Sequence, residues 1–238
     1  MQITVMSRNK AHRFFQTITA EEKKSFACIS ITGYEDPSVS MWVYPKKTIF
    51  LTFDDVDKAD EGVTGSLPMD KEQANLIASF VKLIPDTTTD LVVHCEAGMS
   101  RSAGVAAAIM KWMTNDDSSI FDVPAYRPNM LCYRMTLESL MDESTDPMTE
   151  ELATKILMKF VGTKDNKDRY NRLFILNKEW DRTIYKPLRQ VFAFKCHYAW
   201  KLNSWEKHVT ETFGVIKNCE DHSYMVSPGM AECFNVKL

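Results

Sequence analysis

The sequence predicts an α/β fold, in which a central sheet is flanked by helices, followed by a mainly helical C-terminal extension. Strand-like and helix-like segments alternate over residues 1–146, which is the pattern of layered α/β proteins. A polar, turn-forming run at 142–147 then precedes a change in charge. Residues 1–162 contain 16 Lys and Arg and 23 Asp and Glu, whereas 163–238 contain 13 and 9. We therefore expect two domains, 1–146 and 147–238.

Local patterns predict the elements of the first domain. The pattern Thr19 to Glu22 is a capping box before a short helix, and Asp70 with Gln73 is another before a helix with one apolar face. Small residues and strong helix formers predict a helix over 102–113 that packs closely on a sheet. Short β-rich runs predict strands at 3–6, 27–32, 48–53 and 91–94.

The second domain is expected to be mostly helical. Residues 148–162 predict an amphipathic helix, 165–172 a charged linker, and 173–213 a mostly helical segment. Between 164 and 217, 12 Lys and Arg and 6 Asp and Glu are interleaved with aromatic residues. Such a segment can bind nucleic acid. We favour the simpler interpretation, in which the aromatic side chains form a core against the first domain.

Composition places the chain among soluble globular proteins, since 45% of its 238 residues are hydrophobic and 26% are charged. It shows no secretory leader and no apolar run of the ~18 residues that a membrane helix needs. The six cysteines are scattered, so free thiols in a reducing cytoplasm are expected. Cys196, His197, Cys219 and His222 fit no zinc template, and we expect no metal and no cofactor.

The segment at 91–104 carries the chemistry. A buried strand is expected to end at Cys95, and six residues later Arg101 begins an alanine-rich helix, with Gly98 permitting the tight turn between them. The amides and dipole at a helix N-terminus favour an anion and a thiolate. A guanidinium can grip two phosphate oxygens. The segment thus predicts a site where sulfur attacks a tetrahedral dianion; the alternative, a structural thiol at Cys95, leaves this spacing unexplained.

The run His94-Cys-Glu-Ala-Gly-Met-Ser-Arg-Ser102 resembles the signature of the cysteine-dependent protein-tyrosine and dual-specificity phosphatases, which is His-Cys, five residues, then Arg-Ser or Arg-Thr. Over about residues 1–145 the chain is similar to the small bacterial and phage-type members of that superfamily, with an Ile-Ser-Ile strand and a strand ending in Phe-x-Asp. The resemblance implies a phosphatase-type sheet over 1–146 and does not extend to 146–238.

The resemblance also implies a role for each residue of the run. Cys95 would be the nucleophile that forms a phosphocysteine, Ser102 would donate a hydrogen bond to its sulfur, and His94 would orient the loop. Arg101 would hold the phosphate together with the backbone amides of Glu96, Ala97, Gly98, Met99 and Ser100.

The general acid is expected from the acidic segment 54–61. Asp55 is the first choice because it occupies the second position after the strand-ending Phe53, as in similar proteins. Asp54 is the alternative, and Asp57 and Asp60 follow. Cys95 follows Asp55 by 40 positions, which is longer than the spacing usual in dual-specificity enzymes. Asn129 and Arg127 are expected to support the loop 95–101, which we call the phosphate loop, from behind.

These assignments predict a phosphatase acting on phosphotyrosine, with or without phosphoserine and phosphothreonine, in a phosphorylated protein or peptide. The alternatives are the same chemistry on a phosphoinositide or an RNA 5′ phosphate, a non-catalytic phosphate-binding module, and an arsenate reductase or rhodanese-like thiol enzyme. The phosphate loop contains Glu96 and no lysine, which disfavours highly charged head groups. The choice between phosphotyrosine and dual specificity, the oligomeric state and the role of 147–238 stay open.

Overall fold

The computed structural model describes residues 1–36, 41–57, 65–163, 166, 170–179, 189–202, 205–219, 221–229 and 234–236. The chain divides into two compact units, Met1–Asp146 and Pro147–Leu238, and each unit has its own sheet. None of the helices in the described part combines the length and the hydrophobicity that a membrane crossing requires.

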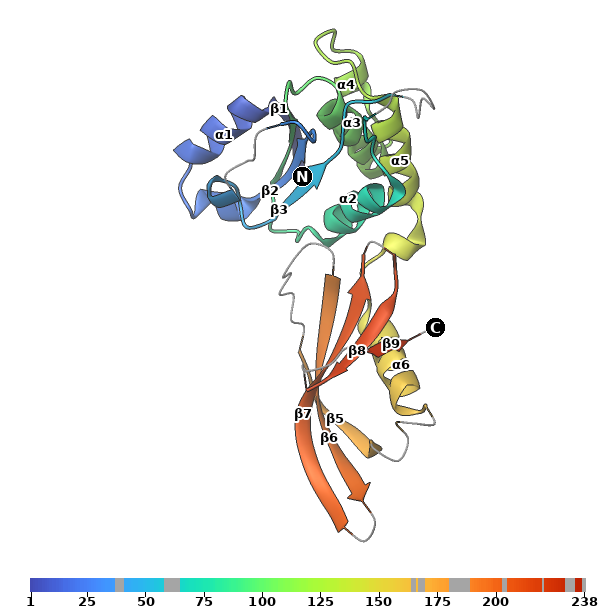
Figure 1. Ribbon diagram of the computed structural model, residues 1–238. Helices are drawn as coiled ribbons and strands as arrows, with labels where there is room; N and C mark the ends of the chain where they lie inside the picture. Colours follow the sequence, from blue (N-terminus) through green and yellow to red (C-terminus); the bar gives the residue numbers. More distant parts are fainter. Residues whose placement is uncertain are drawn as a thin grey trace. The chain divides into compact units, whose positions relative to one another are not determined.

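Unit 1 is built on a parallel sheet of four strands in the order β1-β4-β2-β3. Ser7 lies opposite Cys95, and Ile29 lies opposite Val93. Because all strands run the same way, their carboxyl ends meet at one edge of the sheet (Figure 1). The strands are β1 (Gln2–Ser7), β2 (Phe26–Thr32), β3 (Thr48–Thr52) and β4 (Asp90–Cys95).

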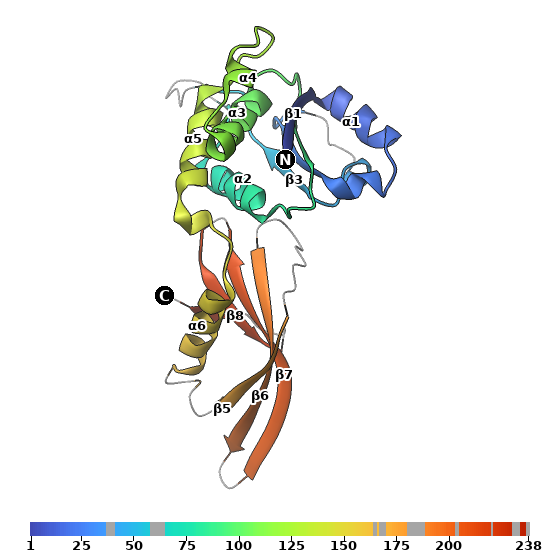
Figure 2. The same ribbon diagram turned by 180° about the vertical axis from the view of Figure 1, so that it is seen from behind.

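Helices cover both faces of this sheet, which confirms the predicted α/β class. Helix α1 lies on one face, and α2 to α5 lie on the other (Figures 1 and 2). Under α1, the buried side chains of Ala11 and Phe15 pack with Cys28, Tyr44 and Val92. The helices are α1 (Arg8–Thr17), α2 (Lys71–Leu83), α3 (Arg101–Thr114), α4 (Ser118–Phe121) and α5 (Met130–Met141), with short 3-10 turns at Glu22–Ser25, Met41–Val43 and Glu143–Thr145.

Both predicted capping boxes are present. Asp70 and Gln73 exchange side-chain to backbone hydrogen bonds at the start of α2. Thr19 and Glu22 do the same, but they lead into a single 3-10 turn instead of an α-helix. Helix α1 was not expected, because it begins at Arg8 directly after β1 without a connecting loop.

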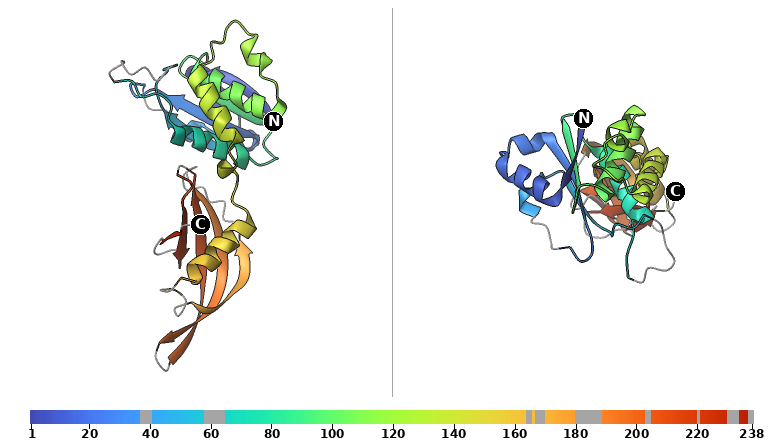
Figure 3. Two further views of the ribbon diagram at one scale, coloured as in Figure 1. Left: turned by 90° about the vertical axis from the view of Figure 1, so that its right-hand side faces the viewer. Right: turned by 90° about the horizontal axis from the view of Figure 1, so that it is seen from above.

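Unit 2 contains an antiparallel sheet of five strands in the order β5-β6-β7-β8-β9 and the helix α6 (Glu150–Val161). Figure 3 (left) shows α6 lying across one face of this sheet. The expected amphipathic helix at 148–162 is therefore confirmed. The strands are β5 (Asn171–Glu179), β6 (Arg189–Leu202), β7 (Trp205–Asn218), β8 (Tyr224–Pro228) and β9 (Phe234–Val236).

The prediction of a mainly helical extension over 147–238 is wrong for its described residues beyond α6. In β6 the side chains of Phe192, Phe194, Cys196 and Tyr198 are all buried, and they recur at every second position. A period of two places them on one face of a strand, where they form a core with α6. Helical spacing was the wrong period for these aromatic residues.

Candidate active site

The loop from Cys95 to Arg101 joins the end of β4 to the start of α3. Its carbonyl groups turn outward: the oxygen of Glu96 accepts from the Arg8 amide (3.2 Å), and that of Met99 accepts from the Arg127 amide (3.0 Å). Within the described part of the chain, the amides of residues 97–100 donate no hydrogen bond. These amides are therefore available to an anion at the helix N-terminus.

Gly98 allows this loop to lie against β1. Its φ is +71°, and a Cβ at this position would lie 2.4 Å from the backbone nitrogen of Ser7. Any other residue would have to adopt a disfavoured conformation and push the two segments apart. The expected turn at Gly98 is thus a structural requirement of the loop.

Cys95, at the start of the loop, faces Ser102 in the first turn of α3. The Cys95 sulfur lies 3.1 Å from the Ser102 hydroxyl oxygen, and the cysteine is 1% exposed. Burial raises the pKa of three other buried thiols, those of Cys28, Cys132 and Cys196. Cys95 lies at the end of β4, directly before the loop that leads into α3, with the Ser102 hydroxyl beside its sulfur.

Arg101 begins α3 and is 7% exposed. Its Nη1 donates to the Phe53 carbonyl oxygen (2.9 Å), and its Nη2 lies 4.0 Å from the Asp36 carboxylate. Its Nε is buried and has no partner among the described residues. A buried donor left open in this way indicates a ligand position.

Asp55 lies close to the phosphate loop. Its Oδ1 accepts hydrogen bonds from the Ser100 hydroxyl (2.8 Å) and from Asn129 Nδ2 (2.9 Å). Ser100 is the N-cap residue of α3, yet its hydroxyl makes no capping bond. Both donors use the same oxygen, and Oδ2 has no hydrogen-bond partner within the described residues.

The neighbouring aspartates have other partners. Asp54 uses both carboxylate oxygens on backbone amides, those of Tyr34 (3.2 Å) and Leu67 (2.9 Å). Asp57 accepts from the amide of Met130 (2.6 Å) at the start of α5. These bonds hold two loops and a helix end in place. Asp60 lies outside the described residues.

Asn129 connects the acidic segment to the phosphate loop. Its side chain accepts from the Cys132 amide (2.9 Å) as the N-cap of α5 and donates to Asp55 and to the Val56 carbonyl (3.1 Å). Its own amide donates to the Ser100 carbonyl (3.2 Å). Asn129 therefore links the loop to the acidic segment, and Arg127 contacts the loop through its backbone.

Two charged residues of this region were missed in the sequence. Arg8, which is buried, forms ion pairs with Glu96 of the loop and with Asp36 (2.6 Å). Asp36 also accepts from the Gly33 amide (2.6 Å). Both residues follow a parallel strand, β1 or β2, and polar residues at the carboxyl ends of such strands commonly line sites. That rule was the signal available.

Within the described residues, the His94 ring makes no hydrogen bond to the Cys95 sulfur. It is fully buried, stacks on Tyr44 with ring centroids 5.3 Å apart, and its ring nitrogens have no partner among the described residues. Burial, reinforced by the Arg8 cation, lowers its pKa to about 4, although a backbone group of Cys95 acts in the opposite direction. The ring is neutral near pH 7 and supports the loop by packing.

The four residues considered for zinc do not converge. Cys196 belongs to the buried face of β6, and the ring of the next residue, His197, bonds to the Thr210 hydroxyl (2.9 Å) on the other face. Within the described residues no three His, Cys, Asp or Glu side chains are grouped so that they could hold a metal ion.

The sequence matches no protein-family model and no curated protein. Among solved structures, the crystal structure of Tk-PTP in the active form is similar to part of this chain, with a TM-score of 0.37 and 14% sequence identity. The alignment covers 58% of this chain and 88% of the Tk-PTP chain. A likeness at this level does not identify an activity.

Proposed function

We propose that the chain is a cysteine-dependent phosphatase of the protein-tyrosine or dual-specificity type, which hydrolyses phosphomonoesters through a phosphocysteine. One arrangement carries the proposal. The Cys95 sulfur, the buried Arg101 guanidinium with its open Nε, and the unengaged amides of residues 97–100 belong to one seven-residue loop. A nucleophile and cationic and amide donors in one loop suit a phosphoryl group better than a neutral ligand.

The first step forms the covalent intermediate. The Cys95 thiolate attacks phosphorus in line, so that a sulfur–phosphorus bond forms while the bond to the leaving oxygen breaks. Arg101 and the loop amides hold the three equatorial oxygens. Asp55 donates its proton from Oδ2 to the leaving oxygen, which departs as an alcohol or phenol.

The second step regenerates the enzyme. Asp55, now a carboxylate, accepts a proton from a water molecule that attacks phosphorus. The sulfur–phosphorus bond breaks, inorganic phosphate is released, and the sulfur leaves as a thiolate. The Ser102 hydroxyl, 3.1 Å from the sulfur, donates a hydrogen bond that stabilises this leaving group.

Asp55 is the better candidate for the acid because of how its oxygens are used. Asp54 has both oxygens on backbone amides, whereas Asp55 keeps Oδ2 open. The ion pairs from Arg8 to Glu96 and Asp36 hold the loop and the surroundings of Arg101. The proposed setting is a reducing cytoplasm, which suits a thiol nucleophile and the five free cysteines of the described part.

Hydrolysis of p-nitrophenyl phosphate in the presence of a chelator tests the proposal. We expect turnover by the wild type and a loss of more than about 10³-fold in Cys95→Ser, since the nucleophile is removed. Cys132→Ser, which changes a buried cysteine outside the loop, is the matched control. Activity that survives in Cys95→Ser, or that the chelator abolishes, would reject this mechanism.

The acid is identified with Asp55→Asn and Asp54→Asn. Asp55→Asn should lower kcat by about 10²–10⁴-fold and flatten the high-pH limb of the profile, because the acid must be protonated to act. The loss should be larger for phenyl phosphate than for p-nitrophenyl phosphate, whose leaving group needs a proton less. If Asp54→Asn shows this pattern and Asp55→Asn does not, the assignment of the acid is wrong.

A further inference from the structure

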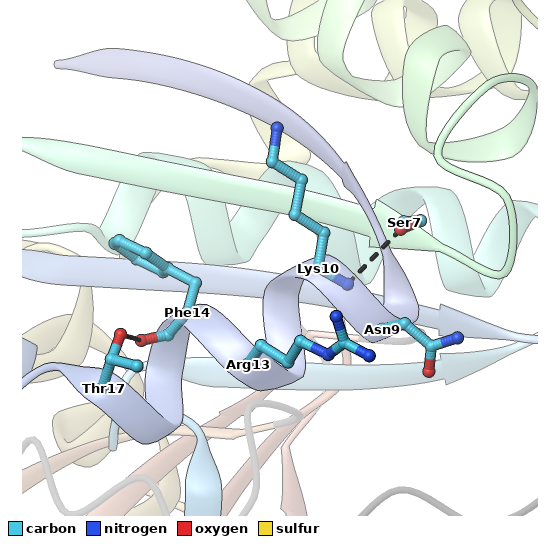
Figure 4. Close-up of a pocket in the computed structure, with 6 residues that line it drawn as sticks. All are labelled: Ser7, Asn9, Lys10, Arg13, Phe14 and Thr17. Atoms are coloured by element: carbon cyan, nitrogen blue, oxygen red, sulfur yellow. Dashed lines mark hydrogen bonds between the residues drawn. The ribbon is translucent and has the colours of Figure 1, made fainter.

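A second feature of unit 1 lies beside the phosphate loop and has no part in the proposed reaction. An open pocket of about 600 Å³ runs along α1, lined by Ser7, Asn9, Lys10, Arg13, Phe14 and Thr17. Figure 4 shows the Lys10 and Arg13 side chains extending from the same stretch of the helix, with the Arg13 guanidinium directed toward Asn9. The pocket is therefore a hollow with two cations at its wall.

The charge of this pocket stands out against its surroundings. Residues 1–146 contain 14 Lys and Arg and 21 Asp and Glu, yet residues 1–20 contain three cations and no carboxylate. Arg8 is turned inward and paired with Asp36 and Glu96. Lys10 and Arg13 are exposed, and no carboxylate of the described residues lies within ion-pair distance of either.

The pocket also has an apolar floor. The half-buried Phe14 ring packs edge to face on Phe15 (5.2 Å between centroids) and Phe26 (5.3 Å). These contacts fix the ring in place, so it presents a rigid apolar surface at little entropic cost. A ligand for this pocket would combine negative charge with some apolar surface.

The pocket is connected to the phosphate loop by backbone contacts. Ser7 packs against Gly98, and the Arg8 amide donates to Glu96. Arg13 lies five residues along the helix from Arg8, which is about 7.5 Å at the rise of an α-helix. A bound peptide in an extended conformation advances about 3.3 Å per residue. Its side chains two or three positions from the phosphorylated residue, whose phosphate occupies the loop, can therefore span this distance.

We infer that the pocket along α1 binds acidic residues of a phosphorylated peptide whose phosphate occupies the loop from Cys95 to Arg101. The inference rests on the proposed function and names its substrate class: acidic phosphoproteins. Two cations suit one or two carboxylates, whereas proteins that bind nucleic acid can neutralise about six to ten phosphates.

The test compares two phosphotyrosine peptides, one with glutamates on both sides of the phosphotyrosine and one with glutamines at the same positions. For the wild type we expect kcat/KM to be roughly fivefold to tenfold higher for the glutamate peptide, because exposed ion pairs contribute about 0–1 kcal/mol each. This preference should shrink in 0.5 M salt. Each value is divided by that protein's own kcat/KM for p-nitrophenyl phosphate, so that general effects on catalysis cancel.

The double variant Lys10→Gln/Arg13→Gln should lose the preference. The matched control is Lys24→Gln/Lys46→Gln, which removes the same charge from exposed residues before β2 and β3, at the opposite edge of the parallel sheet. The inference is overturned if the wild type has no preference, if the double variant keeps it, or if the control loses it equally. A wild type that does not hydrolyse p-nitrophenyl phosphate would instead overturn the proposed function, and the inference with it.

Discussion

The two units of this chain use sheets of opposite kinds. Unit 1 has short parallel strands of five to seven residues, whereas β6 and β7 of unit 2 are antiparallel and 14 residues long. In a parallel sheet every strand ends at the same edge, so the segments that follow are gathered there. Arg8, Asp36, Asp55 and the phosphate loop all follow strands of unit 1 at that edge.

In an antiparallel sheet the connecting turns lie at both ends, and one face of the long strands packs against the core. In unit 2 this face is aromatic, with Phe192, Phe194 and Phe213 fully buried under α6. The parallel sheet therefore gathers polar groups at one edge, and the antiparallel sheet presents a hydrophobic face to α6. The difference predicts that chemistry and stability can be altered separately in the two units.

The largest effect is expected for the phosphate clamp. Arg101→Lys should lower kcat for p-nitrophenyl phosphate by about 10³-fold or more, because a lysine cannot present the planar fork that holds two oxygens at once. The same change in unit 2, at the exposed Arg189, should alter kcat by less than about twofold. Steady-state kinetics on both variants checks this. Comparable losses in the two would remove the distinction between the units.

The next effect concerns the core of unit 2. Phe194 is fully buried and stacks on Phe192 with ring centroids 5.0 Å apart. Phe194→Ala should destabilise unit 2 by about 3–5 kcal/mol, through lost burial and a cavity. Calorimetry should show one transition at a lower temperature, while hydrolysis of p-nitrophenyl phosphate below that temperature is retained. Loss of activity together with the unfolding of unit 2 would show that the units depend on each other.

Much of unit 1 could be predicted from its sequence because local signals and tertiary structure agree there. The capping box at Asp70 and Gln73, the buried strand before Cys95 and the alanine-rich helix after Arg101 each have a distinct residue pattern. Helix α1 has a single boundary signal, its N-cap Ser7, whose hydroxyl accepts from the Lys10 amide (3.3 Å), and one serine at the end of a strand does not predict a helix. Its start is set by the end of β1 and by the bond from the Arg8 amide to Glu96, a contact between residues far apart in the chain.

Unit 2 shows where the sequence was misleading. The aromatic residues of β6 alternate with residues such as Lys195 and His197, and a lysine-rich aromatic segment can be fitted to either period over a short window. The sequence favoured Asp55 over Asp54 only through the position that Asp55 shares with similar proteins, and residue pattern alone could not separate the two. The two are adjacent, and only the backbone path after β3 decides which side chain lies toward Ser100.

The smallest of the three expected effects is a loss of stability at low pH in unit 1 and not in unit 2. Because His94 has a pKa of about 4 in the folded protein and about 6.5 in an unfolded chain, protons bind the unfolded state more tightly. Its contribution to stability is complete above about pH 6.5 and is lost as the pH falls toward 4. The loss amounts to about 3 kcal/mol in unit 1, and unit 2 should not share it.

His94→Phe should remove this dependence, since the new ring can keep the stacking on Tyr44 and has no proton to bind. Urea unfolding of the wild type and the variant at pH 7 and pH 5 would measure it. Tyr44→Phe is the matched control, because it changes the partner ring and leaves His94 able to titrate. If His94→Phe loses as much stability between these pH values as the wild type does, another group of unit 1 causes the acid sensitivity. If unit 2 loses stability between pH 7 and pH 5 and unit 1 does not, the buried His94 is not the cause of the acid sensitivity.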